Sequence, residues 1–276
     1  MHRYYSVTVL LLVCGCGGED GAFASHISAT TDVIASAAST SVHVTLGIPK
    51  DSDDSDDYLI DKGIYVLSYN SERNLANWVA WRLDATDLGT FERTDHFRSE
   101  TDLPTTFYHV KSSDYTNSGF DRGHLCPSAD RTATAAANDT TFLMTNMHPQ
   151  LHALNAGAWS EMETFERSLA VPGKNVYIVA GPLFPTTPST IGHGVQVPSA
   201  SYKVMIVLNS GEGPSDVTTT TPIYAAVMPN VENVNDQAWT TYMTSVDNVE
   251  QLSGYDFFNR VRKRVQTSLE RETNVP

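Results

Sequence analysis

Five runs rich in β-branched and aromatic residues constrain the fold of this chain more than any other feature. Glycine, proline or polar residues bound each run, a pattern typical of short strands. The runs are Gly63–Tyr69, Trp78–Leu83, Asn175–Pro182, Ser201–Val207 and Pro222–Pro229. Helical patterns are fewer, and the best cover about Asn155–Ala170 and Tyr255–Leu269. Together they predict an α+β domain with a central, mainly antiparallel sheet flanked by helices.

The first sixteen residues have the pattern of an export leader. Arg3 precedes Val7–Val13, an apolar run too short to span a bilayer. Val13-Cys14-Gly15-Cys16 looks like a bacterial lipoprotein cleavage box, with Cys16 as the acylated residue; an ordinary secretory signal cut nearby is the alternative. We expect an exported protein, either a cell-envelope lipoprotein anchored to the membrane through Cys16 or a secreted or periplasmic protein.

Composition divides the rest of the chain into a tether and a domain. Residues 17–44 are rich in Ser, Ala, Thr and Gly and predict a flexible tether, which leaves residues 45–270 for the folded domain. Five aspartates fall within Asp51–Asp57. This run lacks the glycine and the ligand spacing of an EF-hand, so we interpret it as a solvated acidic loop.

The residues that carry chemistry lie close together in the middle of the chain. Gly119–Pro127 contains Asp121-Arg122-Gly123-His124, and Thr145–Gln150 and Leu154–Trp159 follow it. Candidate site residues are one histidine, one metal-capable amide, one carboxylate and two arginines: His124, Asn155, Glu163, Arg122 and Arg167. Such a set could handle a water molecule, a divalent cation and a phosphodiester.

Elementary chemistry suggests a role for each charged candidate. The imidazole of His124 titrates near neutral pH and could deprotonate water. Arg122 and Arg167 could hold phosphate oxygens in a rigid fork, although Arg122 could instead pair with Asp121. Glu163 could accept hydrogen bonds from water around a cation; the alternative is an i,i+4 ion pair with Arg167.

Asn155 is the candidate metal ligand, because a hard cation such as Mg²⁺ accepts an amide oxygen and keeps several waters. An asparagine at this point could also be a helix cap, and both roles are compatible. Asn155, Trp159, Glu163 and Arg167 recur every four residues, which predicts one gradually turning helix face. We expect Trp159 to pack into the sheet and fix that helix.

At these residues the sequence resembles the DNA/RNA non-specific endonucleases, the sugar-non-specific ββα-metal nucleases. Asp121-Arg122-Gly123-His124 matches the DRGH signature of that family, and the resemblance covers roughly residues 45–265. It implies a ββα-metal motif, with His124 as the general base and Asn155 as the only direct protein ligand of Mg²⁺ or Mn²⁺. It also implies that Asn146 orients the site.

The resemblance implies an exported, metal-dependent endonuclease that cleaves DNA and RNA without strong sequence specificity. A single divalent ion at Asn155 would stabilise the phosphorane and the leaving 3′ oxygen. Two alternatives stay open: a surface-tethered nucleic-acid-binding protein with little turnover, and a related phosphodiesterase that acts on another substrate. The oligomeric state is also open, a homodimer being one option.

The sequence departs from the family pattern at two points. The formal net charge is −14, and −14 − 1 = −15 without residues 1–15, which carry Arg3 and no acid. That charge disfavours long-range capture of nucleic acid.

Cys126 follows His124 by two residues; burial would make it inert, and a Cys–His hydrolase is the remote alternative. It is the only thiol outside the leader, which excludes an intramolecular disulfide in the mature domain.

One further histidine pair raises the question of zinc. His148 and His152 lie four residues apart, a spacing that binds zinc on a helix. Pro149 stands between them and breaks the helix that this spacing requires. The sequence therefore disfavours a zinc site here.

Overall fold

The computed structural model describes residue 38 and residues 40–276. The predicted leader and most of the predicted tether lie outside these residues. Where the tether was expected to end, the chain is already packed: Val44 is buried and His43 bonds to the backbone oxygen of Gly63 over 3.1 Å. The packed part of the chain therefore begins before residue 45.

A seven-stranded sheet forms the centre of the molecule, and every neighbouring pair in it is antiparallel. All five predicted runs are strands of this sheet. The order is β1-β2-β3-β6-β9-β10-β11. The strands are β1 Tyr58–Asp61, β2 Val66–Asn70, β3 Leu75–Asp84, β6 Lys174–Leu183, β9 Ala200–Asn209, β10 Ile223–Pro229 and β11 Met243–Thr244.

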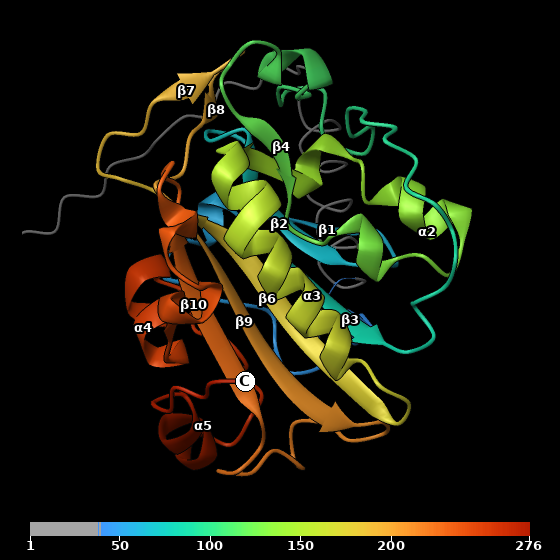
Figure 1. Ribbon diagram of the computed structural model, residues 1–276, viewed down its shortest axis with the longest axis vertical. Helices are drawn as coiled ribbons and strands as arrows, with labels where there is room; N and C mark the ends of the chain where they lie inside the picture. Colours follow the sequence, from blue (N-terminus) through green and yellow to red (C-terminus); the bar gives the residue numbers. More distant parts are fainter. Residues whose placement is uncertain (1–37, 39) are drawn as a thin grey trace, which may run out of the picture.

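Both faces of the sheet are covered, because its strands bury side chains in both directions. Trp81 and Ile178 belong to the core under helix α3, Trp159–Leu169, whereas Trp78 and Val179 belong to the core of the opposite face. Two helices, α4 Val246–Ser253 and α5 Lys263–Leu269, pack on that second face. Figure 1 shows α3 lying across one face, with α4 and α5 beside and below β10.

A separate two-stranded ribbon lies beside α3. It pairs β4 Asp121–His124 with β5 Met147–Gln150, so that His124 stands opposite Met147. The ribbon leads directly into a helical turn, η6 Leu154–Ala158, and then into α3. The predicted α+β class with a ββα unit is confirmed.

The remaining elements are α2 Ala135–Thr140, β7 Thr190–Ile191, β8 Val195–Gln196 and the short turns η1 Val42–Val44, η2 Asp54–Asp56, η3 Ser112–Tyr115, η4 Ser128–Asp130, η5 Met144–Asn146, η7 Val234–Asp236 and η8 Trp239–Tyr242.

The expected helix over Tyr255–Leu269 is mostly wrong, since only its second half, α5, is helical. Phe258 has a φ of +50°, which an α-helix does not allow, and the Arg260 amide donates to the backbone oxygen of Leu46. The apolar spacing there reflects burial against the start of the domain. The preceding helix α4 was missed, although Ser245 caps its start and Gly254 ends it in the left-handed conformation.

The acidic run is solvated only in part. Asp53 and Asp54 are exposed, but Asp57 is half-buried and accepts hydrogen bonds from Ser68 and Asn77. Burial raises the pKa of Asp57, and these hydrogen bonds oppose the increase.

Within the part of the chain that the structure describes, no helix is long and apolar enough to cross a bilayer.

Candidate active site

His124 stands at the end of β4 on the floor of a groove. Its side chain is only 6% exposed, and no hydrogen-bond partner for its Nε2 atom lies among the described residues. The rings of Phe97 and Phe142 lie 5.8 and 5.0 Å from the imidazole, centre to centre. Burial lowers the pKa of His124 to about 3, and the charges of Arg93 and Arg122 contribute. The imidazole is therefore neutral at physiological pH.

Asn146 fixes the chain that follows His124. Its Oδ1 atom accepts a hydrogen bond from the Cys126 amide over 2.9 Å, and its Nδ2 atom donates to the Cys126 and Thr141 oxygens over 2.8 and 2.9 Å. The side chain is fully buried and does not reach the groove. The structure thus places Asn146 as a positioning residue that connects the two strands of the ribbon near His124.

Asn155 lines the groove beside the start of β4, where its Nδ2 atom donates to Asp121 Oδ2 over 2.9 Å. This bond leaves the Oδ1 atom of the amide available to a cation. The expected helix-cap role is wrong, because Asn155 lies inside the π-helical turn η6 and its side chain caps nothing. Asp121 also binds His152 Nδ1 over 2.8 Å, so this carboxylate orients the amide.

A distant asparagine holds the turn that presents Asn155. Asn235, on η7, donates to the Ala153 oxygen over 2.7 Å and accepts from the Ala158 amide over 2.9 Å. Gly157 allows this approach, since a Cβ atom there would meet the Asn235 side chain at 2.1 Å. The π turn has non-helical backbone angles at Gly157, so the gradually turning face expected from Asn155 to Arg167 is interrupted between Asn155 and Trp159.

Helix α3 presents Glu163 and Arg167 to the groove and Trp159 to the core. As expected, Trp159 is buried against the sheet, and its Nε1 atom donates to the His124 backbone oxygen over 3.2 Å. Glu163 lines the groove and is half-buried. Desolvation and the nearby charge of Asp130 raise the pKa of Glu163 to about 7, and the neighbouring cationic side chains oppose this increase.

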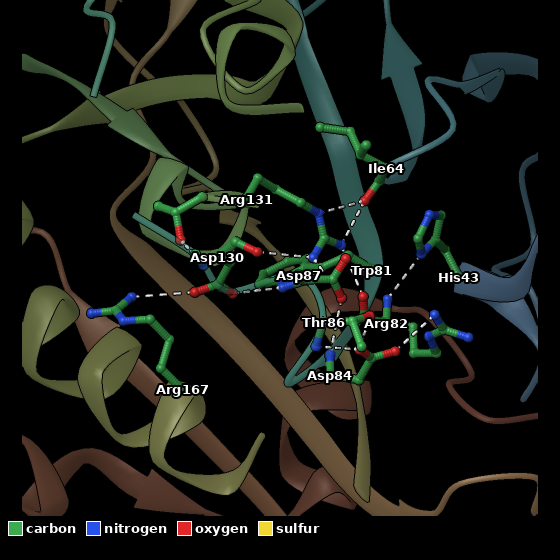
Figure 2. A network of polar contacts seen from close by, with 12 residues as sticks. His43, Ile64, Trp81, Arg82, Asp84, Thr86, Asp87, Asp130, Arg131 and Arg167 are labelled. Atoms are coloured by element: carbon green, nitrogen blue, oxygen red, sulfur yellow. Dashed lines mark hydrogen bonds and ion pairs between the residues drawn. The ribbon is translucent and has the colours of Figure 1, made fainter. Parts of the chain in front are cut away.

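Arg167 forms an ion pair with Asp130 over 3.2 Å (Figure 2). It does not pair with Glu163. Asp130 is fully buried and also accepts from Trp81 Nε1 over 2.9 Å. The adjacent Arg131 donates to the backbone oxygens of Ile64 and Arg82, which connects this corner to the sheet (Figure 2). The guanidinium of Arg167 is therefore held at the groove by a network that reaches β3.

Arg122 also lines the groove, and the predicted alternative of an ion pair with Asp121 is wrong. Its guanidinium lies over the Phe97 ring, 4.2 Å from the centre, and donates to Ser112. Asp121 is engaged by His152 and Asn155 instead. Arg122 thus keeps its charge available to an anion in the groove.

Arg93, the third arginine of the groove, was not among the residues predicted from the sequence. It lies on the segment between β3 and β4, where its guanidinium lies 4.9 Å from the centre of the Phe142 ring and donates to Ser128 Oγ over 3.1 Å. No motif surrounds it, and only the fold brings it to His124. The phenylalanines whose rings contact Arg93 and Arg122 were the sequence signal that could have indicated Arg93.

These side chains line two adjoining hollows, which we call the catalytic groove. One has a volume of about 520 Å³ and contains His124, Asn155, Glu163 and Arg167 in its wall; the other has about 470 Å³ and includes Asp121. Arg93, Arg122 and Asn155 line both hollows. The structure therefore brings together five of the six predicted site residues, the exception being Asn146.

The residues of the groove fit a hard divalent cation. The amide oxygen of Asn155 and the carboxylate of Glu163 line the same hollow, and both are oxygen donors of the kind that Mg²⁺ and Mn²⁺ prefer. A cation here would oppose the desolvation that raises the pKa of Glu163. Asn155 and Glu163 are accordingly the residues that would hold it, directly or through water.

The histidine pair does not form a joint metal site, and Cys126 lies in the core outside the groove. His148 is buried and bonds to Ser201 Oγ over 2.8 Å, whereas His152 is exposed and binds Asp121, so the two rings serve different partners. Cys126 is a buried free cysteine in the core, and burial raises the pKa of its thiol well above the usual range. A buried thiol of this kind is a poor nucleophile.

A ββα unit that gathers a histidine, an amide and three arginines into one groove defines a class of phosphodiester-cleaving metal nucleases. The sequence model of the DNA/RNA non-specific endonucleases matches residues 45–264. The chain therefore belongs to the DNA/RNA non-specific endonuclease family and is an endonuclease whose substrates are nucleic acids. The family is metal-dependent, typically with a divalent metal.

Individual relatives agree with this assignment. A nuclease of Nostoc sp. is 40% identical over 267 residues, which cover 95% of this chain and 94% of the relative. Human mitochondrial endonuclease G is 32% identical over 72% of this chain and 69% of its own length. A crystal structure of the EndoG/EndoGI complex, described as showing the mechanism of EndoG inhibition, matches with a TM-score of 0.69 and 26% identity, covering 81% of this chain and 92% of that one.

Proposed function

We propose that this endonuclease hydrolyses DNA and RNA with His124 as general base and a single divalent ion, Mg²⁺ or Mn²⁺, at Asn155. The observation that carries the proposal is that both residues line one hollow together with Arg93, Arg122 and Arg167. A phosphodiester bound by the arginines would lie between the base and the cation ligand. Little sequence specificity follows, because phosphate contacts carry no direct base information.

The protonation state of His124 suits a base once substrate is bound. In the free protein its pKa of about 3 makes the imidazole neutral but a weak base at pH 7. Arg93 and Arg122 contribute to that low pKa through their charges. Burial is the main cause of that low pKa; a phosphodiester bound to these arginines would offset only their contribution, and the pKa of His124 should then rise in part.

The other residues bind and orient. Arg93, Arg122 and Arg167 bind phosphate oxygens, and Asp121 holds the amide of Asn155 with its oxygen toward the groove. When bound, the divalent ion supplies positive charge that offsets charge on the phosphorane and the leaving 3′ oxygen. Trp159 and Asn146 position the His124 backbone and the loop behind it.

The decisive experiment uses plasmid DNA and RNA with and without EDTA. Wild type should cleave both, and EDTA should abolish both activities. His124→Ala should stay folded and lose at least about 10² in rate, the usual scale of general-base catalysis. The matched control is His193→Ala, which removes an exposed histidine outside the groove. Near wild-type cleavage by folded His124→Ala would refute the assignment, and binding without turnover in wild type would favour a nucleic-acid-binding protein.

We further propose that the protein is exported and anchored to the cell envelope through a lipid on Cys16. The support is the leader pattern of residues 1–16 and the Ser/Ala/Thr-rich segment after it. The wild-type protein should then partition with membranes, and Cys16→Ser should release it. A wholly soluble wild type whose mature N-terminus lies beyond Cys16 would exclude the anchor.

A further inference from the structure

Three carboxylates gather far from the catalytic groove, on the opposite face of the sheet. They belong to Asp247, Glu250 and Glu270, and one oxygen from each lies within 4.8 Å of the others. Asp247 and Glu250 are one turn apart on α4, and Glu270 directly follows α5. The Asp247 amide donates to the Glu270 backbone oxygen over 3.0 Å, so the two helices already meet here.

Glu270 is the member of this cluster that most needs a partner. Its side chain is 2% exposed, and its Oε1 atom has no hydrogen-bond partner among the described residues. Burial, with the charge of Glu250 next to it, raises the pKa of Glu270 to about 8. Burial likewise raises the pKa of Glu250 to about 7. A buried carboxylate oxygen without a partner is costly, which points to a bound cation or a shared proton.

The basic side chains nearby do not satisfy this oxygen. Arg271 Nε lies 3.7 Å from Asp247, and its side chain is 68% exposed. Lys263 Nζ lies 3.9 Å from Asp256 Oδ1 and is also mostly exposed. Asp256 adds a further negative charge close by and raises the pKa of both Glu250 and Glu270. When Glu250 and Glu270 are both ionised, the interior of the cluster therefore carries excess negative charge.

We propose that Asp247, Glu250 and Glu270 form a Ca²⁺ site that joins α4 to the C-terminal helix α5 and is separate from the catalytic groove. The donors are all oxygen, without histidine or cysteine, a set that favours Ca²⁺ over zinc or copper. Calcium takes oxygen ligands at about 2.3–2.6 Å, so two oxygens on opposite sides of the ion are about 4.6–5.2 Å apart, which accommodates this cluster. Water would complete the coordination on the exposed side of Asp247.

The site is structural because of what it connects. Val246 and Val249 of α4 and Leu269 of α5 belong to the core on the sheet face opposite α3. Ion binding would replace repulsion between Glu250 and Glu270 with a shared contact that holds the end of α5 against the start of α4. Calcium should therefore raise the thermal stability of the domain without acting on the groove.

The test measures thermal unfolding of the full mature chain carrying Asn155→Ala, which removes the proposed amide ligand of the groove. Tm is measured in EDTA and in CaCl₂ at pH 8. At a hundredfold excess over Kd, calcium should raise Tm by about 5–10 °C, and MgCl₂ at the same concentration should raise it less. An unchanged Tm in CaCl₂ would overturn the proposal.

A pair of glutamine variants in the same background assigns any shift to the cluster. Glu270→Gln removes the buried charge, so it should raise Tm in EDTA and lose the response to calcium. Glu272→Gln changes an exposed glutamate two residues further on and should keep the full calcium shift. A calcium shift that survives Glu270→Gln would overturn the proposal, and this result is independent of the nuclease mechanism because no activity is measured.

Discussion

At the scale of single residues, Asp121 holds in place the amide that we propose as the cation ligand. Its Oδ2 atom lies 2.9 Å from Asn155 Nδ2 and 2.8 Å from His152 Nδ1. These contacts direct the amide oxygen of Asn155 away from Asp121. The sequence showed the DRGH motif but not this role, because the contact joins β4 to the turn after β5.

Asp121→Ala should therefore impair metal binding through Asn155. We expect the Mg²⁺ concentration for half-maximal activity to rise by about 10–100-fold, the usual effect of losing the partner of a metal ligand. Activity at saturating Mg²⁺ should recover largely. Metal titrations of plasmid cleavage measure this, with Glu161→Ala on the exposed side of α3 as the control. An unchanged Mg²⁺ requirement would show that Asp121 does not orient the ligand.

Residue chemistry in one short stretch of sequence identified His124, Asn155, Glu163, Arg122 and Arg167, all of which line the groove. Arg93 and Asn235 escaped notice for a physical reason. Arg93 pairs locally with Asp95, but its contacts to Phe142 and Ser128, which hold it at the groove, are distant in sequence, as are the contacts of Asn235 to the backbone of η6. Neither has a local pattern that distinguishes it from a surface residue.

At the scale of elements, the five apolar runs were predictable as strands, and helix α3 lies within the helix expected over Asn155–Ala170, whereas α4 was missed and only the second half of the expected C-terminal helix is helical. The strands of the sheet centre are buried on both faces and so read as continuous apolar runs. The segment before α5 also has apolar spacing, but Phe257 and Phe258 are buried by tertiary packing against the second face. The π turn η6 was unpredictable because Asn235, from the end of another segment, holds it open.

Gly157→Ala tests the importance of the π turn. The new Cβ would displace the Asn235 side chain and break its bonds to Ala153 and Ala158. We expect a loss of stability of about 1–3 kcal/mol and weaker Mg²⁺ binding. Gly213→Ala is the matched control, since nothing lies within 4 Å of its added Cβ. Urea unfolding and metal titration measure both effects, and equal behaviour of the two variants would show that the turn tolerates the methyl group.

At the scale of the whole molecule, buried titratable groups set the pH range of stability. Burial lowers the pKa of His43 to about 4 and of His148 to about 3, below the ordinary value of 6.5. The unfolded chain thus binds more protons below pH 6.5, and acid destabilises the fold. Burial raises the pKa of Glu250 to about 7 and of Glu270 to about 8, so the folded chain keeps protons that the unfolded chain loses above about pH 4.5.

These shifts predict a stability maximum between about pH 4.5 and 6.5 in EDTA. The free energy of unfolding should fall on the alkaline side as Glu250 and Glu270 ionise up to about pH 8, and on the acid side as the histidines protonate. Urea unfolding from pH 4 to 9 measures the profile. Glu270→Gln should flatten the alkaline side, and a maximum at pH 8 in wild type would contradict the assignment.

Net charge and local charge predict different behaviour with nucleic acid. The chain carries −14 overall, yet Arg93, Arg122 and Arg167 meet in the groove. Three phosphate contacts give a log–log slope of affinity against salt of about −3 at most. We expect KM for duplex DNA to rise accordingly between low and physiological salt at fixed Mg²⁺, with kcat nearly constant. A slope of about −5 or beyond would reveal a wider basic surface than these arginines.

The order of the strands has a consequence for how such enzymes can be rebuilt. β3 and β6 are neighbours in the sheet, yet the chain between them, residues 85–173, carries every groove residue named above. All residues of the catalytic groove thus lie in one uninterrupted segment that joins two neighbouring strands of the sheet. Splicing that single segment between relatives would transfer the groove residues in one piece, provided that the recipient also supplies the side chains that hold the segment from outside, among them Trp81, Lys203, Asn230 and Asn235.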